Sequence, residues 1–152
     1  MISPAKSTAL KNHAGIGVKA LKIDFHDYDA MARHFDSWLQ IAVTPGIEEL
    51  TVRPSSRRKD YNFPWSLLAD GSGHSIRYLN LSCCAFCPTV GLGLRSITRL
   101  DLLDVRITED GLGCLLHNLF SLQWMQLSHC HGMTHLKIPR LLQPLSYLEV
   151  FG

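Results

Sequence analysis

The sequence has no long apolar run and no strong excess of charge, and we expect no secretory leader. No stretch approaches the roughly 18 consecutive apolar residues of a membrane helix. Met1–Gly17 has no apolar core of the kind found in a secretory signal. The formal net charge of +2 gives little attraction to nucleic acid or to an acidic membrane. We therefore expect an intracellular protein, cytoplasmic, nuclear or both, with no nucleic-acid and no membrane partner.

Motifs for phosphate binding and nucleophilic catalysis are also missing. There is no nucleophile elbow, P-loop or dinucleotide fingerprint, and the glycines of 91–93 have the spacing of neither phosphate motif. Cys114 lies in an apolar stretch typical of a core. Capping of a helix is a sufficient explanation for the polar cluster at His26–Asp29. We expect no enzymatic activity and no cofactor.

The sequence does contain an apolar frame that repeats. In Ser75–Cys87 an apolar residue is followed by two variable residues, an apolar one, one variable, an apolar one, two more variable residues and a small or apolar one. Ser96–Ile107 and Ser121–Met133 have the same spacing. The frame positions are Ile76, Leu79, Leu81 and Cys84; Ile97, Leu100, Leu102 and Val105; and Leu122, Met125, Leu127 and Cys130.

This spacing is the frame of the leucine-rich repeat, in which each unit supplies one short strand and a helix or tighter turn. Looser copies upstream give starting points at residues 18, 47, 76, 97 and 122, with steps of 29, 29, 21 and 25 residues. Because no unit can bury its own apolar face, the units must stack. We predict an α/β fold: a short solenoid with a curved parallel sheet on its concave side and helices and irregular turns on its convex side.

The pattern also predicts the boundaries of domains and elements. We expect an irregular lead-in over residues 1–17 and a repeat domain over 18–152, with about six to seven repeats, truncated at both ends. The three cations of Arg57–Lys59 indicate a solvated loop, or alternatively a contact for phosphate or an acidic partner. Close copies of the frame at Met133 and Leu145 predict two further strands joined by tight turns. The other predicted strands are 18–25, 47–53, 76–82, 97–103 and 122–128. Three helices are predicted: one over 28–43 with Asp27 as its N-cap, one over 63–69, and one that begins after Thr108 as its N-cap.

The five cysteines are odd in number, which favours free thiols in a reducing compartment. Cys84 and Cys130 occupy a frame position that turns in beneath the strand, where a weakly polar side chain can meet backbone groups. A metal site is the alternative, because Cys84 and Cys87 have ligand spacing and histidines occur within 129–135. A single pair of this kind is weak support, so we expect no metal.

Side chains between the frame positions point out of the sheet, because side chains alternate along a strand. They form columns across successive strands. The first column is Ala20, Glu49, Tyr78, Arg99, Trp124 and Tyr147, the second is Lys22, Thr51, Asn80, Asp101, Gln126 and Glu149, and the third is Asp24, Arg53, Ser82, Leu103 and Ser128.

The concave face built from these columns is the surface that such folds use for binding. Tyr, Trp and Arg are enriched at the hot spots of protein interfaces, although stacked strands also place some aromatic residues together by chance. We predict that an unidentified protein partner binds this face. The residues predicted to contact it are Tyr78, Asn80, Arg99, Asp101, Trp124, Gln126, Glu49 and Tyr147.

Five segments carry a resemblance to a known family. They read FDSWLQIAVTPGIEEL (35–50), YNFPWSLLADG (61–71), SIRYLNLSCCAF (75–86), VRITEDGLGCLL (105–116) and LKIPRLLQPLSYLEV (136–150). Through them the chain from Val18 to Val150 resembles the leucine-rich-repeat part of plant F-box/LRR proteins, particularly a group expanded in grasses. In that family an F-box binds the adaptor of a cullin-based ubiquitin ligase, and the repeats are thought to receive the protein to be ubiquitinated.

The resemblance implies a substrate-recognition module. No F-box helices precede Val18, so we do not expect this chain by itself to bind the adaptor. The alternative is an orphaned or truncated fragment without a ligase role, which self-associates through strands exposed at its uncapped ends.

Overall fold

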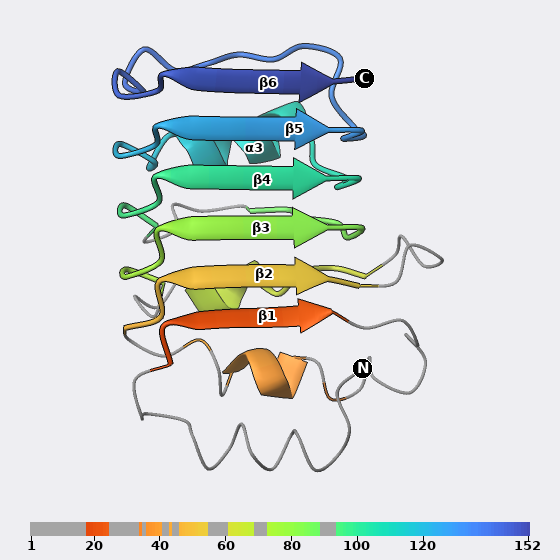
Figure 1. The fold of residues 1–152 in the computed structure, drawn as a ribbon. Coiled ribbons are helices and arrows are strands. Elements are labelled where there is room, and N and C mark those ends of the chain that lie inside the picture. Colours follow the sequence, from red (N-terminus) through yellow and green to blue (C-terminus); the bar gives the residue numbers. More distant parts are fainter. Residues whose placement is uncertain are drawn as a thin grey trace.

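The computed structural model describes residues 18–24, 34, 36–40, 43, 46–54, 61–68, 73–88 and 94–152. Within these residues six strands of five residues each form one sheet in which every neighbouring pair is parallel (Figure 1). The strands lie in the order of the sequence, so each inner strand lies between those of the units before and after it. They are β1 (Ala20–Asp24), β2 (Glu49–Arg53), β3 (Tyr78–Ser82), β4 (Arg99–Leu103), β5 (Trp124–Ser128) and β6 (Tyr147–Phe151).

The first five strands begin two residues later than the frame predicts. The first apolar residue of a unit closes a turn, and its N–H donates to the carbonyl three residues earlier, as Ile76 does to Gly73 and Ile97 to Leu94. Ile47, Ile76, Ile97 and Leu122 are fully buried although they precede their strands, whereas Val18 is only partly buried. Burial therefore starts at the first frame position, whereas pairing with the neighbouring strand starts two residues later.

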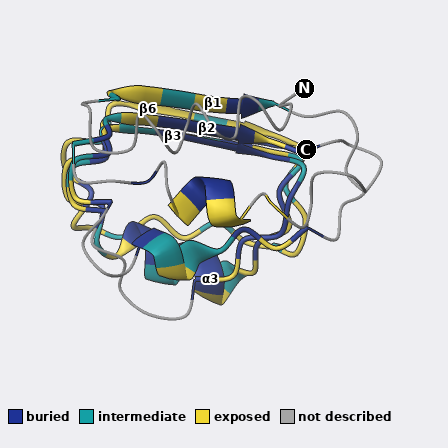
Figure 2. Ribbon diagram, turned by 90° about the horizontal axis from the view of Figure 1, so that it is seen from below, coloured by how far each residue is buried: buried dark blue, intermediate teal, exposed yellow. Residues whose placement is uncertain are grey.

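Among the described residues, the helices lie on one face of the sheet (Figure 2). The helix α3 (Glu109–Leu116) begins where predicted, and the Thr108 hydroxyl accepts a hydrogen bond from Gly111 N at 3.0 Å. A 3-10 helix, η1 (Trp65–Leu68), forms within the predicted short helix. His34 and residues 36–40 are helical as predicted. Val43, the last residue of the predicted first helix, is described and is not helical. The predicted cap at Asp27, the other residues of that helix and the cationic loop 57–59 lie outside the described residues.

One continuous core fills the space between the sheet and the helices. The frame residues on the inner face of β2 to β5 are at most 1% exposed, and each contributes about 1.5–3 kcal/mol through removal of its apolar surface from water. Phe63 and Phe86 add an edge-to-face pair with centroids 5.5 Å apart. The buried frame residues of β2 to β5 are Leu50, Val52, Leu79, Leu81, Leu100, Leu102, Met125 and Leu127.

Among the described residues, no helix has the length and apolar character needed to cross a membrane.

The prediction of a strand starting at Met133 is wrong. β5 pairs directly with β6, and residues 132–146 contain no strand. An 11-residue step is too short, because a parallel neighbour requires a crossing of about a dozen residues or more. Met133 and Leu136 instead pack against the core from the return segment, and the next unit starts at Leu145, where the strand predicted there forms as β6.

The chain bends sharply where strands β3 to β5 end. Cys83, Asp104 and His129 follow these strands at equivalent positions and have φ of 55°, 52° and 52°. This left-handed conformation is uncommon for residues with a side chain. It turns the chain into a row of isolated parallel bridges that joins Asn62, Ala85, Arg106 and His131.

Candidate functional site

The face of the sheet opposite the helices, called here the open face, carries the predicted columns. In the first column the register pairs Glu49 with Tyr78, and then Arg99, Trp124 and Tyr147 in turn. The second column runs in register through Thr51, Asn80, Asp101, Gln126 and Glu149. The register therefore aligns the eight candidate residues in two columns, and their contact with a partner stays a prediction.

Four side chains of the first column form a continuous stack, called here the column-one stack. The Arg99 guanidinium carbon lies 5.0 Å from the centroid of the Tyr78 ring and 4.0 Å from that of Trp124. Trp124 and Tyr147 stack in turn, with centroids 5.0 Å apart and planes 3° from parallel. Neighbouring strands are about 4.8 Å apart, which matches the spacing of stacked groups. A parallel, in-register sheet thus aligns planar side chains across β3, β4, β5 and β6.

Hydrogen bonds tie the stack to the second column. The Tyr78 hydroxyl donates to Asp101 Oδ2 at 2.7 Å and accepts from Asn80 Nδ2 at 2.8 Å. Arg99 Nε lies 3.5 Å from the same Asp101 oxygen. Burial raises the pKa of the Tyr78 phenol, an effect that the Asn80 hydrogen bond opposes and the Asp101 carboxylate reinforces. Tyr78 therefore stays a donor at neutral pH and holds the Asp101 carboxylate in place.

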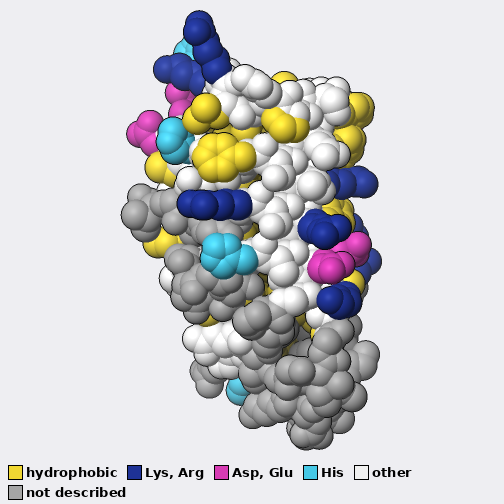
Figure 3. Space-filling model, turned by 90° about the vertical axis from the view of Figure 1, so that its left-hand side faces the viewer, with side chains coloured by type: hydrophobic (Ala, Val, Ile, Leu, Met, Phe, Trp, Pro, Cys, Tyr) yellow, Lys and Arg dark blue, Asp and Glu magenta, His cyan; other side chains and the backbone are white. Residues whose placement is uncertain are grey.

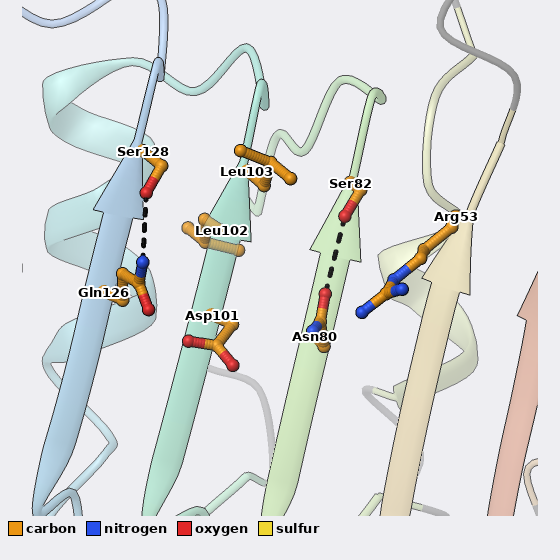
Figure 4. A pocket seen from close by; sticks show the side chains of 8 residues that line it. All are labelled: Arg53, Asn80, Ser82, Asp101, Leu102, Leu103, Gln126 and Ser128. Carbon is orange, nitrogen blue, oxygen red and sulfur yellow. Dashed lines mark hydrogen bonds between the residues drawn. The ribbon is translucent and has the colours of Figure 1, made fainter. Parts of the chain in front are cut away.

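A pocket of about 130 Å³ opens between the second and third columns (Figure 4). Asp101 Oδ1 is buried and has no hydrogen-bond partner among the described residues. Gln126 Nε2 donates to Ser128 Oγ at 3.3 Å, and Ser82 Oγ donates to Asn80 Oδ1 at 3.5 Å. The lining residues are Arg53, Asn80, Ser82, Asp101, Leu102, Leu103, Gln126 and Ser128.

The sequence analysis placed parts of this pocket but did not identify it. Asn80, Asp101 and Gln126 were predicted contact residues, whereas Arg53, Ser82, Leu103 and Ser128 belonged only to the third column. Ser82 and Ser128 are small residues between larger ones, and that contrast is the signal for a hollow. Phe151, the register partner of Ser128, continues the third column and was missed.

A second hollow, of about 300 Å³, lies beyond the strand ends and is lined by Cys84, Asp104, Arg106 and His131. His131 Nε2 is 3.0 Å from Asp104 Oδ1. Burial, aided by Cys83 and Cys130, raises the pKa of the Cys84 thiol to about 12, which favours the neutral thiol over the nucleophilic thiolate at neutral pH.

The cysteines support the structural interpretation more than the metal alternative. Cys84 is buried whereas Cys87 is exposed, and no group of three His, Cys, Asp or Glu residues within the described ranges is placed to hold a metal ion. Cys130 Sγ lies 3.5 Å from the Leu102 carbonyl oxygen, as expected of a weakly polar side chain that meets backbone beneath the strand.

Charges of both signs are interspersed on the edge where the strands begin (Figure 3). Lys19 Nζ and Glu48 Oε1 lie 3.7 Å apart there, with exposed side chains. Such surface pairs contribute little to stability. Among the described residues, this edge therefore carries charges of both signs and not a field of one sign.

Each unit supplies one short parallel strand, the strands follow the order of the sequence, and short helices cover one face of the sheet. This arrangement, with aligned columns on the open face, is that of a leucine-rich-repeat domain. A family model described as "At1g61320/AtMIF1, LRR domain" matches residues 9–152, and the chain belongs to this plant leucine-rich-repeat family. No curated protein and no solved structure matches the chain. Domains of this class are in general modules for protein interaction.

Proposed function

We propose that the chain is a non-catalytic interaction module that binds a partner protein on its open face, and that its repeats coil as a short solenoid with this face on the concave side. The observation that carries the proposal is the column-one stack. Its residue types are those that dominate interface hot spots. It runs across four adjacent strands, so one partner segment can lie along all of it.

The stack is ordered before a partner binds. The Arg99 side chain is 51% exposed, yet it is held between two rings and beside a carboxylate. Immobilising a free side chain on binding costs about 0.5–1.5 kcal/mol. Because neighbouring side chains already hold Arg99 in place, most of this cost is met during folding. The exposed part of the stack is thereby ready for contact.

The resemblance to plant F-box/LRR proteins supports a more specific role. In this proposal the repeats recognise a protein destined for ubiquitination, in the cytoplasm or the nucleus. The repeats alone do not bind the ligase adaptor, because the resemblance assigns that contact to an F-box.

Site-specific photo-crosslinking tests the open face directly. A photoreactive phenylalanine analogue at Tyr147 is expected to capture a partner from cell extract, for identification by mass spectrometry. Trp124→Ala in the same chain should reduce the capture, because it removes the neighbouring ring. The same analogue at Arg140, exposed in the return segment before β6, is the control. Equal capture at both positions would contradict the proposal.

A specific observation favours self-association as a second candidate role. Leu148 and Val150 of β6 are 43% and 54% exposed, whereas their register partners Met125 and Leu127 are at most 1% exposed. β6 is an outer strand of the six-stranded sheet, and an outer strand can pair with another strand. The occupant we propose is β6 of a second copy, because two such strands paired antiparallel would form a closed twofold dimer.

A further inference from the structure

The pocket between the second and third columns has a chemistry of its own. Asp101 Oδ2 is engaged by Tyr78 and approached by Arg99, whereas Asp101 Oδ1 has no hydrogen-bond partner among the described residues. A buried carboxylate oxygen left without a donor is unfavourable, because the desolvation of the charge is not compensated. The pocket therefore favours an occupant that brings an N–H or O–H group to this oxygen.

The other polar groups near Asp101 include a further acceptor for a donor group. Gln126 uses its amide N–H on Ser128 and Asn80 uses its amide N–H on Tyr78. The Gln126 side-chain oxygen faces the pocket region as a further acceptor (Figure 4). One N–H of each amide is thus engaged within the protein, whereas Asp101 Oδ1 and the Gln126 side-chain oxygen can still accept a hydrogen bond.

The size of the pocket suits the end of a side chain. Its volume of about 130 Å³ equals that of about four molecules of liquid water. Its mouth lies on the open face, between the strands that carry the column-one stack. A partner segment lying along the stack would have the pocket beside it.

We propose that this pocket receives a basic side chain, of lysine or arginine, from the protein bound on the open face; this inference rests on the proposed function. The ammonium or guanidinium group donates to Asp101 Oδ1 and to the Gln126 side-chain oxygen. Arg53 also lines the pocket, from β2, and its side chain extends towards Asn80 and Ser82 on β3 (Figure 4). It is exposed and can turn its charge into solvent.

Small cations test the site without knowledge of the partner. n-Butylammonium and methylguanidinium are titrated as chlorides into the ¹⁵N-labelled chain, with sodium acetate as the anionic counterpart. Either cation is expected to cause saturable shifts of the Asn80 and Gln126 side-chain amide signals, and acetate is not. Saturable shifts with acetate and none with the cations would overturn the proposal and indicate an anion site at Arg53.

Variants separate the pocket from a general attraction of cations. Asp101→Asn keeps the shape but removes the charge, and it should weaken cation binding about tenfold or more, since a hydrogen bond to a charged group contributes about 1.5–3 kcal/mol. Gln126→Met removes the second acceptor without changing the charge and should weaken binding less. Lys22→Ala, in the same column on β1 but outside the pocket, should leave binding unchanged. Cation binding that survives both Asp101→Asn and Gln126→Met would refute the assignment.

The two proposals fail in different ways. If a partner is captured at Tyr147 but neither cation binds, the basic side chain is wrong and the interaction surface stands. If cations bind in the pocket but no partner is captured at Tyr147, the site chemistry stands and the proposed function is wrong.

Discussion

The Arg99 guanidinium lies 4.0 Å from the centroid of the Trp124 ring, which is closer than its 5.0 Å to the Tyr78 ring. The two residues are direct register partners on β4 and β5. An exposed cation–π contact contributes about 0.5–1 kcal/mol, and an aromatic pair such as Trp124 with Tyr147 about 0.5–1.5 kcal/mol. Trp124 is therefore the residue on which the order of the column-one stack most depends.

Replacement of Trp124 by alanine should lower the free energy of unfolding by about 1–2.5 kcal/mol, because both contacts are lost. Urea unfolding followed by circular dichroism measures the change. A double-mutant cycle with Arg99→Ala isolates the contact between the two, and we expect a coupling of about 0.5–1 kcal/mol. Strictly additive effects would show that the observed proximity stabilises nothing.

Loss of the Tyr78 hydroxyl should cost more than loss of the Tyr147 hydroxyl. Tyr78→Phe removes the donor to Asp101 Oδ2 and the acceptor for Asn80 while the ring stays beside Arg99. Leaving a buried polar group unsatisfied costs about 1–3 kcal/mol. Tyr147→Phe is the matched control, since the Tyr147 hydroxyl donates to Glu149 on an exposed part of the sheet. Equal unfolding midpoints for the two variants would contradict the role assigned to Tyr78.

The success of the column prediction has a simple physical cause. Each unit contributes a strand of equal length in the same alternation, so parallel pairing places Tyr78 beside Arg99 and Arg99 beside Trp124 with no further information. The frame failed at Met133 because apolar residues of a return segment have the same spacing as a strand. Apolar residues are buried against the core both in a strand and in a return segment, so burial does not distinguish the two.

The pocket and the stack were beyond what the sequence pattern specifies. Columns show which residues are neighbours, but not that the Arg99 side chain lies flat between two rings, which depends on its rotamer. The hollow beside Asp101 arises because Ser82 and Ser128 are too short to fill the space around it. The Tyr78 hydroxyl on β3 donates to Oδ2 of Asp101 on β4 and so leaves Oδ1 without a donor. The frame does not specify this contact between side chains of neighbouring strands.

The contact of Glu109 with the return segment should make stability depend on acid pH. Glu109 Oε1 accepts from the Thr134 hydroxyl, Thr134 N and His135 N at 2.6, 2.8 and 2.8 Å. These bonds, the Thr134 side-chain one foremost, lower the pKa of Glu109 from 4.5 to about 2. A pKa lowered by folding gives stability that is fully present above the unfolded value and lost as pH falls.

Wild type should therefore exceed Glu109→Gln in unfolding midpoint at neutral pH, and the difference should shrink between pH 4.5 and about 2. Asp110→Asn removes the same charge from the same end of α3 and serves as the control. A Glu109→Gln difference that stays constant over this pH range would show that the charge of Glu109 is irrelevant to the contact.

The exposed edge of β6 makes a prediction about association. If copies pair through this strand, the weight-average mass in sedimentation equilibrium rises with protein concentration, and so does the melting temperature. Val150→Lys should abolish both trends, because a charge on an edge strand opposes pairing. Leu141→Lys is a closely matched control: Leu141 is 53% exposed against 54% for Val150, but it lies outside the edge strand. If the two variants behave alike, association depends on general hydrophobicity and not on the edge. If wild type has the mass of one chain at every concentration, self-association through β6 is excluded and partner binding on the open face is the role left to test.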